Sequence, residues 1–159
     1  MEIKEAILDI ELSMVKDFLA SFDLRYESDI DKTLYIEENG KIIASISKAK
    51  DIIKCLAILP SYQSENLSSI LISKIIEKMH EENIHSYMVF TKAMYENTFI
   101  NLGFRKLVST SNTVMLEGGL ETIDEAINKM KIKINAEYGN INQDISVGSV
   151  VMNANPITL

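Results

Sequence analysis

Residues 55–104 read CLAILPSYQSENLSSILISKIIEKMHEENIHSYMVFTKAMYENTFINLGF, and this stretch decides the fold. Its first apolar run, 56–59, ends at Pro60 and is typical of a fully buried strand. The segment after the next turn has apolar residues at helical spacing, which predicts a long helix with one face inward. Those residues are Leu67, Leu71, Ile75 and Met79, joined by Ile70, Ile72 and Ile76.

More elements follow the long helix. Residues 86–90 form a second apolar run, and because a helix separates it from the first, we expect two parallel neighbouring strands. A second helix is predicted over 92–102, where Gly103 ends it. Strands are then expected at 104–108 and 113–117, paired with each other.

The turn before the long helix is short and polar. Ser64 is placed to cap the helix, and Glu65 falls in its first turn, where a negative charge suits the helix dipole. Asn83 suits the left-handed residue that ends the helix. The backbone N–H groups at such a helix N-terminus can hold a phosphate, although most helix N-termini bind only water.

The segments before residue 55 predict a helix and a meander. Residues 8–22 have the spacing of an amphipathic helix. Residues 34–46 predict a β-hairpin, because Asn39 and Gly40 both tolerate the positive φ angles of a two-residue turn. Residues 52–59 then return as the third antiparallel strand.

The segments after residue 117 suggest a change of domain. Gly118-Gly119 marks a break, and 120–134 has the pattern of one more helix. We therefore expect a first domain over 1–134, a polar linker over 135–146 and the start of a second domain over 147–159.

Composition narrows the class of protein. The 159 residues are 47% hydrophobic, which is enough for one sizeable core. A net charge of −7 without a basic cluster argues against nucleic-acid binding. Cys55 is the only cysteine, so no intrachain disulfide is expected. The sequence shows no apolar signal segment and no membrane span, which favours a cytoplasmic protein.

In the order of its elements the chain resembles the GNAT acetyltransferases, with a Pro-x-Tyr-Gln turn at 60–63 and Asn-Leu-Gly-Phe at 101–104. The resemblance implies an α+β fold, in which helices flank a mixed sheet made of an antiparallel meander and a parallel central pair. The family's cofactor turn matches this chain at Gln63, Asn66 and Ser68. It implies a coenzyme A site formed by Ile58, Gln63, Ser64, Glu65, Asn66, Leu67, Ser68 and Lys92.

The catalytic pattern of that family is not matched. The position of its tyrosine proton donor is Phe99, which has no proton to give, and the strand 52–59 offers Lys54 and Cys55 but no carboxylate base. Tyr62 and Tyr95 could substitute in principle, but packing or surface roles are simpler explanations. Catalytic residues therefore stay unassigned.

The last residues, VGSVVMNANPITL at 147–159, resemble the first strand and loop of the nucleotidyltransferase domain of the citrate lyase ligase family. That family also has a GNAT-like domain, whose pattern is matched at 62–63, 90–92, Phe99 and 102–104. The resemblance implies nucleotide contacts from Asn153, Asn155, Pro156 and Thr158. In the family a Gly-His pair completes this loop, so we expect the chain to be the N-terminal portion of a longer ligase.

The resemblance implies a reaction and partners. The family activates acetate with ATP and passes the acetyl group to the thiol of a dephospho-coenzyme A-derived prosthetic group on the citrate lyase acyl carrier subunit. This chain would bind the coenzyme A-like arm or the carrier and would lack the adenylating site. Two alternatives stay open: a stand-alone N-acetyltransferase using acetyl-coenzyme A, and a non-catalytic module that docks the carrier.

Other chemically notable residues favour structural roles. Cys55 lies in an apolar strand with no neighbouring base, so packing is expected. His80 and His85 lack a third ligand at metal spacing, and no metal site is expected. Lys92 could reach a phosphate or a carboxylate, but a solvated lysine is the simpler interpretation.

Overall fold

The computed structural model describes residues 2–119 and 131–132. The described residues 2–119 belong to one compact unit. The helix expected at 120–134, the linker and the start of a second domain lie outside the described residues, apart from the helical pair 131–132.

The compact unit has, in chain order, β1 (Lys4–Glu5), α1 (Asp9–Ala20), β2 (Lys32–Glu38), β3 (Lys41–Ala49), β4 (Ile52–Ile58), the 3-10 helix η1 (Pro60–Glu65), α2 (Leu67–Glu81), β5 (Ser86–Lys92), the 3-10 helix η2 (Ala93–Tyr95), α3 (Glu96–Asn101), β6 (Arg105–Ser109) and β7 (Thr113–Gly119).

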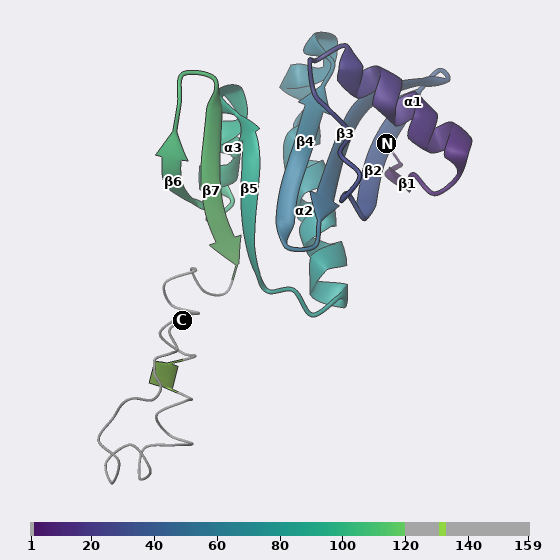
Figure 1. The fold of residues 1–159 in the computed structure, drawn as a ribbon. Helices are drawn as coiled ribbons and strands as arrows, with labels where there is room; N and C mark the ends of the chain where they lie inside the picture. The colour runs from purple at the N-terminus through teal and green to yellow at the C-terminus, as the bar shows by residue number, and fades with distance from the viewer. Residues whose placement is uncertain (1, 120–130, 133–159) are drawn as a thin grey trace, which may run out of the picture. The chain divides into compact units, whose positions relative to one another are not determined.

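Seven strands form one mixed sheet in the order β1-β2-β3-β4-β5-β7-β6 (Figure 1). The pair β4–β5 is parallel and the other five pairs are antiparallel. The expected meander and parallel central pair are therefore confirmed. The short strand β1 was not predicted, because two residues carry no periodicity.

The β2–β3 hairpin forms as its turn sequence predicts. Asn39 and Gly40 have φ angles of 53° and 79°, and Glu38 pairs with Lys41 directly across the turn. Positive φ at both turn positions matches the right-handed twist of the two strands, which is why this turn joins them without a longer loop.

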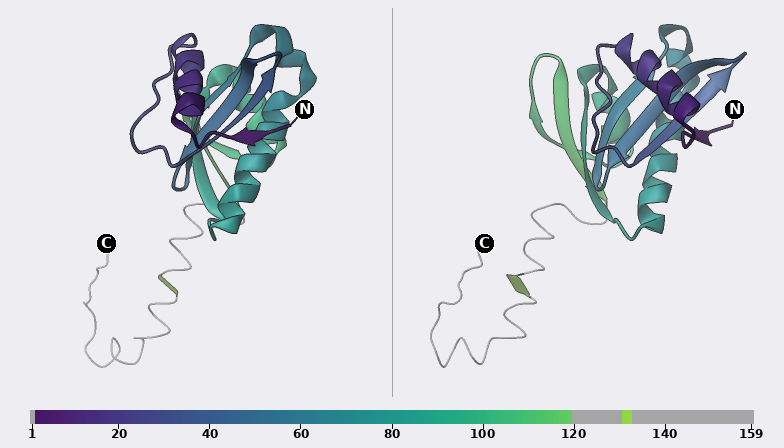
Figure 2. Two further views of the ribbon diagram at one scale, coloured as in Figure 1. Left: turned by 90° about the vertical axis from the view of Figure 1, so that its right-hand side faces the viewer. Right: turned by 45° about the vertical axis from the view of Figure 1, so that its right-hand side comes forward.

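Helices cover the two faces of the sheet, with α1 on one side and α2 on the other (Figure 2). The α1 core includes Val15 and Leu19 of the helix, packed with Tyr35 and Ala57 of the sheet. The core on the α2 side contains Leu67, Leu71, Ile75 and Met79, the four residues predicted to line the inner face of the helix. Ile70, predicted to face inward, is 44% exposed. Among the described residues, no helix combines the length and apolar character needed to cross a bilayer.

The start of α2 differs from the prediction. Ser64 and Glu65 lie in η1, and α2 begins only at Leu67, after Asn66 in a left-handed conformation with φ of 59°. The predicted cap at Ser64 and the predicted first-turn place of Glu65 are therefore wrong. Pro60 explains the difference, because it starts the 3-10 helix η1, and that helix includes Ser64 and Glu65. The left-handed Asn83 after α2 is confirmed, with φ of 62°.

Gly118 and Gly119 do not break the sheet. They extend β7, where Gly118 pairs with Tyr87 and Gly119 with Ser86. A Cβ on Gly118 would lie 2.7 Å from the Phe104 ring. The strand ends at Gly119, so the predicted strand 113–117 is longer by two residues, and glycine allows it to approach its neighbour closely there.

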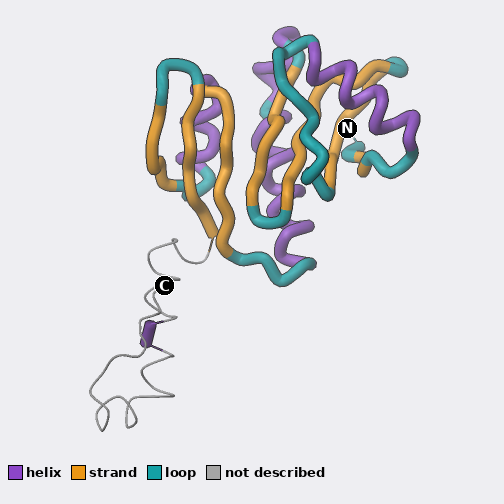
Figure 3. The backbone as a smooth tube through the Cα atoms, in the orientation of Figure 1, coloured by secondary structure: helices purple, strands orange, loops and turns teal. Residues whose placement is uncertain are grey.

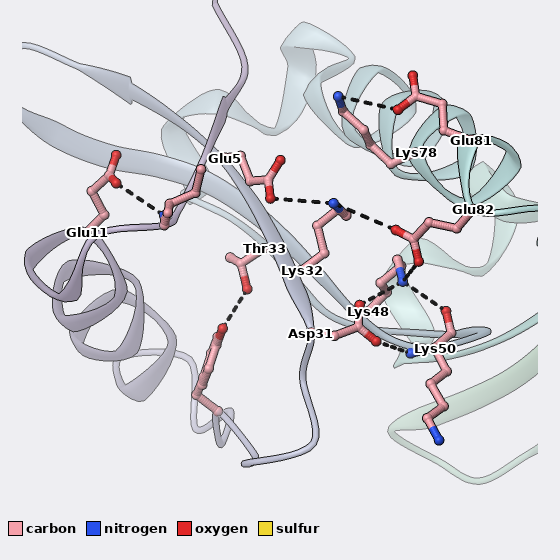
Figure 4. Close-up of polar contacts among 12 residues, drawn as sticks. Glu5, Glu11, Asp31, Lys32, Thr33, Lys48, Lys50, Lys78, Glu81 and Glu82 are labelled. Atoms are coloured by element: carbon pink, nitrogen blue, oxygen red, sulfur yellow. Dashed lines mark hydrogen bonds and ion pairs between the residues drawn. The ribbon is translucent and has the colours of Figure 1, made fainter.

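A buried lysine connects α2 to the sheet (Figure 4). The Lys48 side chain is fully buried, and its Nζ donates to Asp31 Oδ1 at 2.7 Å and to Glu82 Oε1 at 3.0 Å. Burial opposes ionisation of Asp31, but Lys48 and the Lys50 backbone N–H outweigh it and hold the pKa of Asp31 below its usual value. Since Glu82 follows the last residue of α2, this cluster fixes the C-terminal end of the helix that carries the candidate cofactor turn at its other end.

Candidate functional site

The central strand β4 contains a bulge at Cys55. Ala57 pairs with Ser45 and Lys54 with Ser47, so β4 has an extra residue between these pairs, and Cys55 has a positive φ of 60°. A bulge bends its strand and interrupts pairing. The pairing of β4 with β5 is accordingly limited to Ile52 with Met88 and Ile53 with Val89, just before the bulge.

Beyond the bulge, β4 and β5 diverge (Figures 1 and 3). A cavity of about 370 Å³ lies there, bordered also by the loop that follows α1. It is lined by Leu24, Arg25 and Glu27 of the loop, residues 54–56 of β4, residues 90–92 of β5, and Thr113 of β7. The bulge thus creates the cavity at the centre of the sheet.

Tyr95 contacts the end of β4 and the turn that follows it. Its hydroxyl accepts hydrogen bonds from the Ile58 backbone N–H and from Gln63 Nε2, both at 3.2 Å. Gln63 Nε2 also donates to the Ile58 carbonyl at 2.8 Å. Tyr95 is only 3% exposed, so a ligand that bonds the Ile58 N–H would have to displace its hydroxyl.

We expect Tyr95→Phe to lower the free energy of unfolding by about 1–3 kcal/mol, because the buried Ile58 N–H loses its partner. Urea unfolding measures this change. Tyr87→Phe is the control: this tyrosine is also buried as a residue, but its hydroxyl makes only a 3.4 Å contact with His80 Nε2. Equal losses for the two variants would contradict the assigned role of Tyr95.

The predicted cofactor residues fall into two places. Ile58, Gln63, Ser64, Glu65, Asn66, Leu67 and Ser68 belong to the end of β4, to η1 and to the start of α2. In this turn Ser64, Glu65 and Asn66 are exposed, whereas Leu67 is buried. Lys92 instead lines the cavity, and none of the other predicted residues does.

Lys92 is half-buried and has a fixed contact. Its Nζ donates to the Phe22 carbonyl at 2.8 Å and lies 5.5 Å from the centre of the Phe22 ring. The simpler interpretation of Lys92 as a freely solvated side chain is therefore wrong. The loop that follows α1 supplies this partner from 70 residues away in the sequence.

The cavity lacks a group suited to proton abstraction. Glu27 Oε1 accepts from Lys54 Nζ at 2.8 Å, so this carboxylate is already paired. Burial raises the pKa of the Cys55 thiol to about 11, which keeps the sulfur protonated at neutral pH. The thiol instead donates to the Arg25 carbonyl at 3.4 Å, in agreement with a packing role.

Phe99 is fully buried and does not line the cavity. Its ring packs edge-on against Phe104, with 5.0 Å between the ring centres. The rings of His80 and His85 lie 4.9 Å apart, centre to centre, and are tilted by 45° to each other. The described part of the chain holds no cluster of three potential metal ligands. The nucleotide-binding residues expected from Asn153 to Thr158 lie outside the described residues.

Sequence reasoning missed four polar residues of the cavity as candidates for a site: Arg25, Glu27, Thr91 and Thr113. The pattern Phe-Thr-Lys at 90–92 drew attention to Lys92 but not to Thr91 beside it. Arg25 lies 30 residues before Cys55, and nothing in the sequence signals that the loop around it reaches the bulge.

Comparison with known proteins relates the chain to two groups. It is 29% identical over 152 residues to citrate (pro-3S)-lyase ligase of Escherichia coli K12 and 28% identical over 143 residues to that of Klebsiella pneumoniae. The matches cover 93% and 89% of this chain, which spans about 40% of the length of each relative. No protein-family model matches the chain.

Solved structures agree with the expected fold. Escherichia coli ElaA superposes on 74% of the chain with a TM-score of 0.63 and 12% identity. The PaiA N-acetyltransferase of Thermoplasma acidophilum, in complex with coenzyme A, covers 75% with a TM-score of 0.54 and 14% identity. The chain is therefore similar in sequence to part of the citrate lyase ligases, and its described domain has the GNAT acetyltransferase fold.

Proposed function

We propose that this chain is the GNAT-type part of an ATP-dependent ligase that acetylates the thiol of the dephospho-coenzyme A-derived prosthetic group of citrate lyase. The observation that carries the proposal is the sequence similarity to two such ligases over about nine-tenths of the chain. In the overall reaction acetate and ATP give acetyl-adenylate and pyrophosphate. The thiol then attacks the acetyl carbon, and AMP leaves.

The role proposed for this domain is to hold the coenzyme A-like arm of the carrier subunit. The first α-helical hydrogen bond of α2 runs from the Ile70 N–H to the Asn66 carbonyl. The N–H groups of residues 67–69 therefore point out of the helix N-terminus, where the helix dipole favours a phosphate. The left-handed Asn66 provides the backbone bend for which the GNAT cofactor turn uses glycine.

The charges of the cavity favour this role over amine acetylation. An amine acceptor needs a base to remove its proton, and the carboxylate at the cavity wall, Glu27, is held by Lys54. Arg25 and Lys92 at the same wall would also repel an ammonium group. A thiol acceptor needs no such base once the acetyl group is activated as an adenylate.

Calorimetric titration of the chain with dephospho-coenzyme A tests the proposal. We expect saturable binding that Asn66→Gly retains, because glycine adopts the same left-handed conformation. Asn66→Val should weaken binding about tenfold or more, because a β-branched residue is strained at a φ of 59°. The absence of heat at high ligand concentration would contradict the proposal.

Two assays separate the alternatives. Acetyl transfer from acetyl-coenzyme A to small amines by the purified chain would support a stand-alone N-acetyltransferase. Capture of the citrate lyase carrier subunit after removal of its prosthetic group would support a docking module that does not contact the arm.

A further inference from the structure

The cavity between β4 and β5 has positive charges at its wall that no carboxylate balances, in a chain whose net charge is −7. Its charged lining residues are Arg25, Glu27, Lys54 and Lys92. Lys54 Nζ lies 2.8 Å from Glu27 Oε1 and 3.4 Å from Asp29 Oδ2, so these carboxylates are paired with Lys54. Among the described residues, neither Arg25 nor Lys92 has a carboxylate within ion-pair distance.

Lys92 is held at the cavity wall without being neutralised. Its Nζ donates to the Phe22 carbonyl at 2.8 Å, and a carbonyl carries no net charge. In the described part of the chain this is its one hydrogen bond, so two of the three ammonium hydrogens remain as donors. Arg25 adds a guanidinium, which stays charged at any pH at which the protein is folded. A negatively charged atom in the cavity therefore lies in the field of two cations.

Much of the remaining wall is apolar. Leu24, Leu56 and Phe90 line the cavity, and Phe90 is 44% exposed although it is aromatic. Apolar walls lower the local dielectric constant, which strengthens the attraction between a cation and an anion in the cavity. Partly exposed, cationic surroundings of this kind lower the pKa of a thiol, because they stabilise the thiolate. The lining therefore suits a sulfur atom that has to ionise.

The thiol of the protein itself does not use these charges. Cys55 Sγ donates to the Arg25 carbonyl at 3.4 Å, away from the guanidinium charge. Burial raises the pKa of this thiol to about 11, and the opposing attraction of Lys54 is the smaller effect. A thiolate in the cavity must therefore come from a ligand.

Strand β4 leads from the cavity to the turn before α2. Residues 54–56 lie three to five positions before Leu59, at which η1 begins to form. This separation is about 10–17 Å of extended strand. The pantetheine part of coenzyme A is a chain of two amide-linked units with the thiol at its end, and its length is similar. An arm whose pyrophosphate lies at the start of α2 can therefore place its sulfur in the cavity.

We propose, as an extension that rests on the function proposed above, that Arg25 and Lys92 hold the sulfur of the arm as a thiolate, with its methylene groups against Leu24, Leu56 and Phe90. The thiol proton is released to water. The sulfur then bonds to the acetyl carbon of the adenylate, the bond from that carbon to the phosphate oxygen breaks, and its electron pair leaves with AMP. The two cations thus make a general base unnecessary.

The ionisation of the bound thiol can be measured without the ligase reaction. Dephospho-coenzyme A is alkylated with iodoacetamide between about pH 6 and pH 10, free in solution and with the full chain in excess. Mass spectrometry separates the alkylated ligand from protein alkylated at Cys55. Because the thiolate is the reacting form, the midpoint of the rate against pH gives the pKa of the thiol. We expect the bound midpoint to lie about one pH unit or more below the free one.

Four variants test the two cations. Lys92→Met and Arg25→Gln should each raise the bound midpoint by about half a pH unit or more, while calorimetry shows that dephospho-coenzyme A still binds. Lys92→Arg should keep the lowered midpoint, because it keeps the charge. Lys41→Met removes a charge at the exposed start of β3 and should leave the midpoint unchanged.

The outcomes distinguish this role from binding of the arm. A bound midpoint equal to that of the free thiol would overturn the role of Arg25 and Lys92 while leaving the binding of dephospho-coenzyme A intact. Equal shifts for Lys41→Met and Lys92→Met would do the same, because the effect would then depend on net charge alone. Absence of binding in calorimetry would overturn both this role and the proposed function.

Discussion

Replacing both carboxylates around Lys48, in the double variant Asp31→Asn with Glu82→Gln, should lower the free energy of unfolding by about 3–5 kcal/mol. The Lys48 side chain is fully buried, and its two charged partners are these carboxylates, at 2.7 and 3.0 Å. Without them an ammonium stays buried next to amide oxygens and the Lys50 carbonyl, which compensate its charge much less well. Urea unfolding at neutral pH measures the loss.

Lys48→Met is the control for this prediction. It removes the charge but keeps an unbranched side chain in the same space, and the two carboxylates it leaves behind are each 40% exposed and can be hydrated. We expect a loss below about 2 kcal/mol. A larger loss for Lys48→Met than for the double variant would contradict this prediction. It would show that the attraction between Lys48 and the two carboxylates matters more for stability than the cost of an unpaired buried charge.

The pH dependence has a definite sign. Burial opposes the charge on Lys48, but Asp31 and Glu82 outweigh it and raise its pKa above the usual value. This contribution to stability is fully present below the usual lysine pKa and is lost as the pH rises through the folded value. In the double variant only burial remains, so the difference in stability between the two proteins should narrow as the pH approaches 10.5.

Gly119→Ala should lower the free energy of unfolding by about 2–6 kcal/mol. Gly119 has a φ of +110°, a conformation that costs a residue with a side chain roughly 1–3 kcal/mol. A Cβ at this position would also lie 2.1 Å from the His85 carbonyl oxygen, and overpacking adds a further cost of about 1–3 kcal/mol. The clash falls at the start of β5, the strand that forms one wall of the cavity.

Gly103→Ala separates the two costs. Gly103 has a similar φ of +96°, but a Cβ there would meet nothing within 4 Å. We expect it to lose only the conformational part, about 1–3 kcal/mol. Both variants are compared by urea unfolding with the unaltered chain, and equal losses would mean that the close approach of β7 to His85 is unimportant.

The structure agrees with the expected fold but adds a cavity that the sequence did not predict. The GNAT resemblance directed attention to the turn before α2, and the conformation of Asn66 agrees with that expectation. The cavity next to Cys55 has a different character, because its free charges are cations.

Much of the fold is local in origin and could be read from the sequence. The Asn39-Gly40 turn fixes the β2–β3 hairpin through the backbone angles of two adjacent residues. The apolar spacing of α2 fixes which of its faces is buried, and the helix between β4 and β5 supplies the crossover that a parallel pair needs.

The site depended on tertiary structure because its contacts join residues far apart in the chain. The bulge at Cys55 exists only relative to the register of β3, and the cavity it opens is closed by a loop 30 residues earlier. The contacts of Tyr95 with Ile58 and of Lys92 with Phe22 span 37 and 70 residues. Periodicity and turn chemistry describe neighbours along the chain, so they determined the elements, while the packing of those elements decided which side chains are paired, buried or left free to bind a ligand.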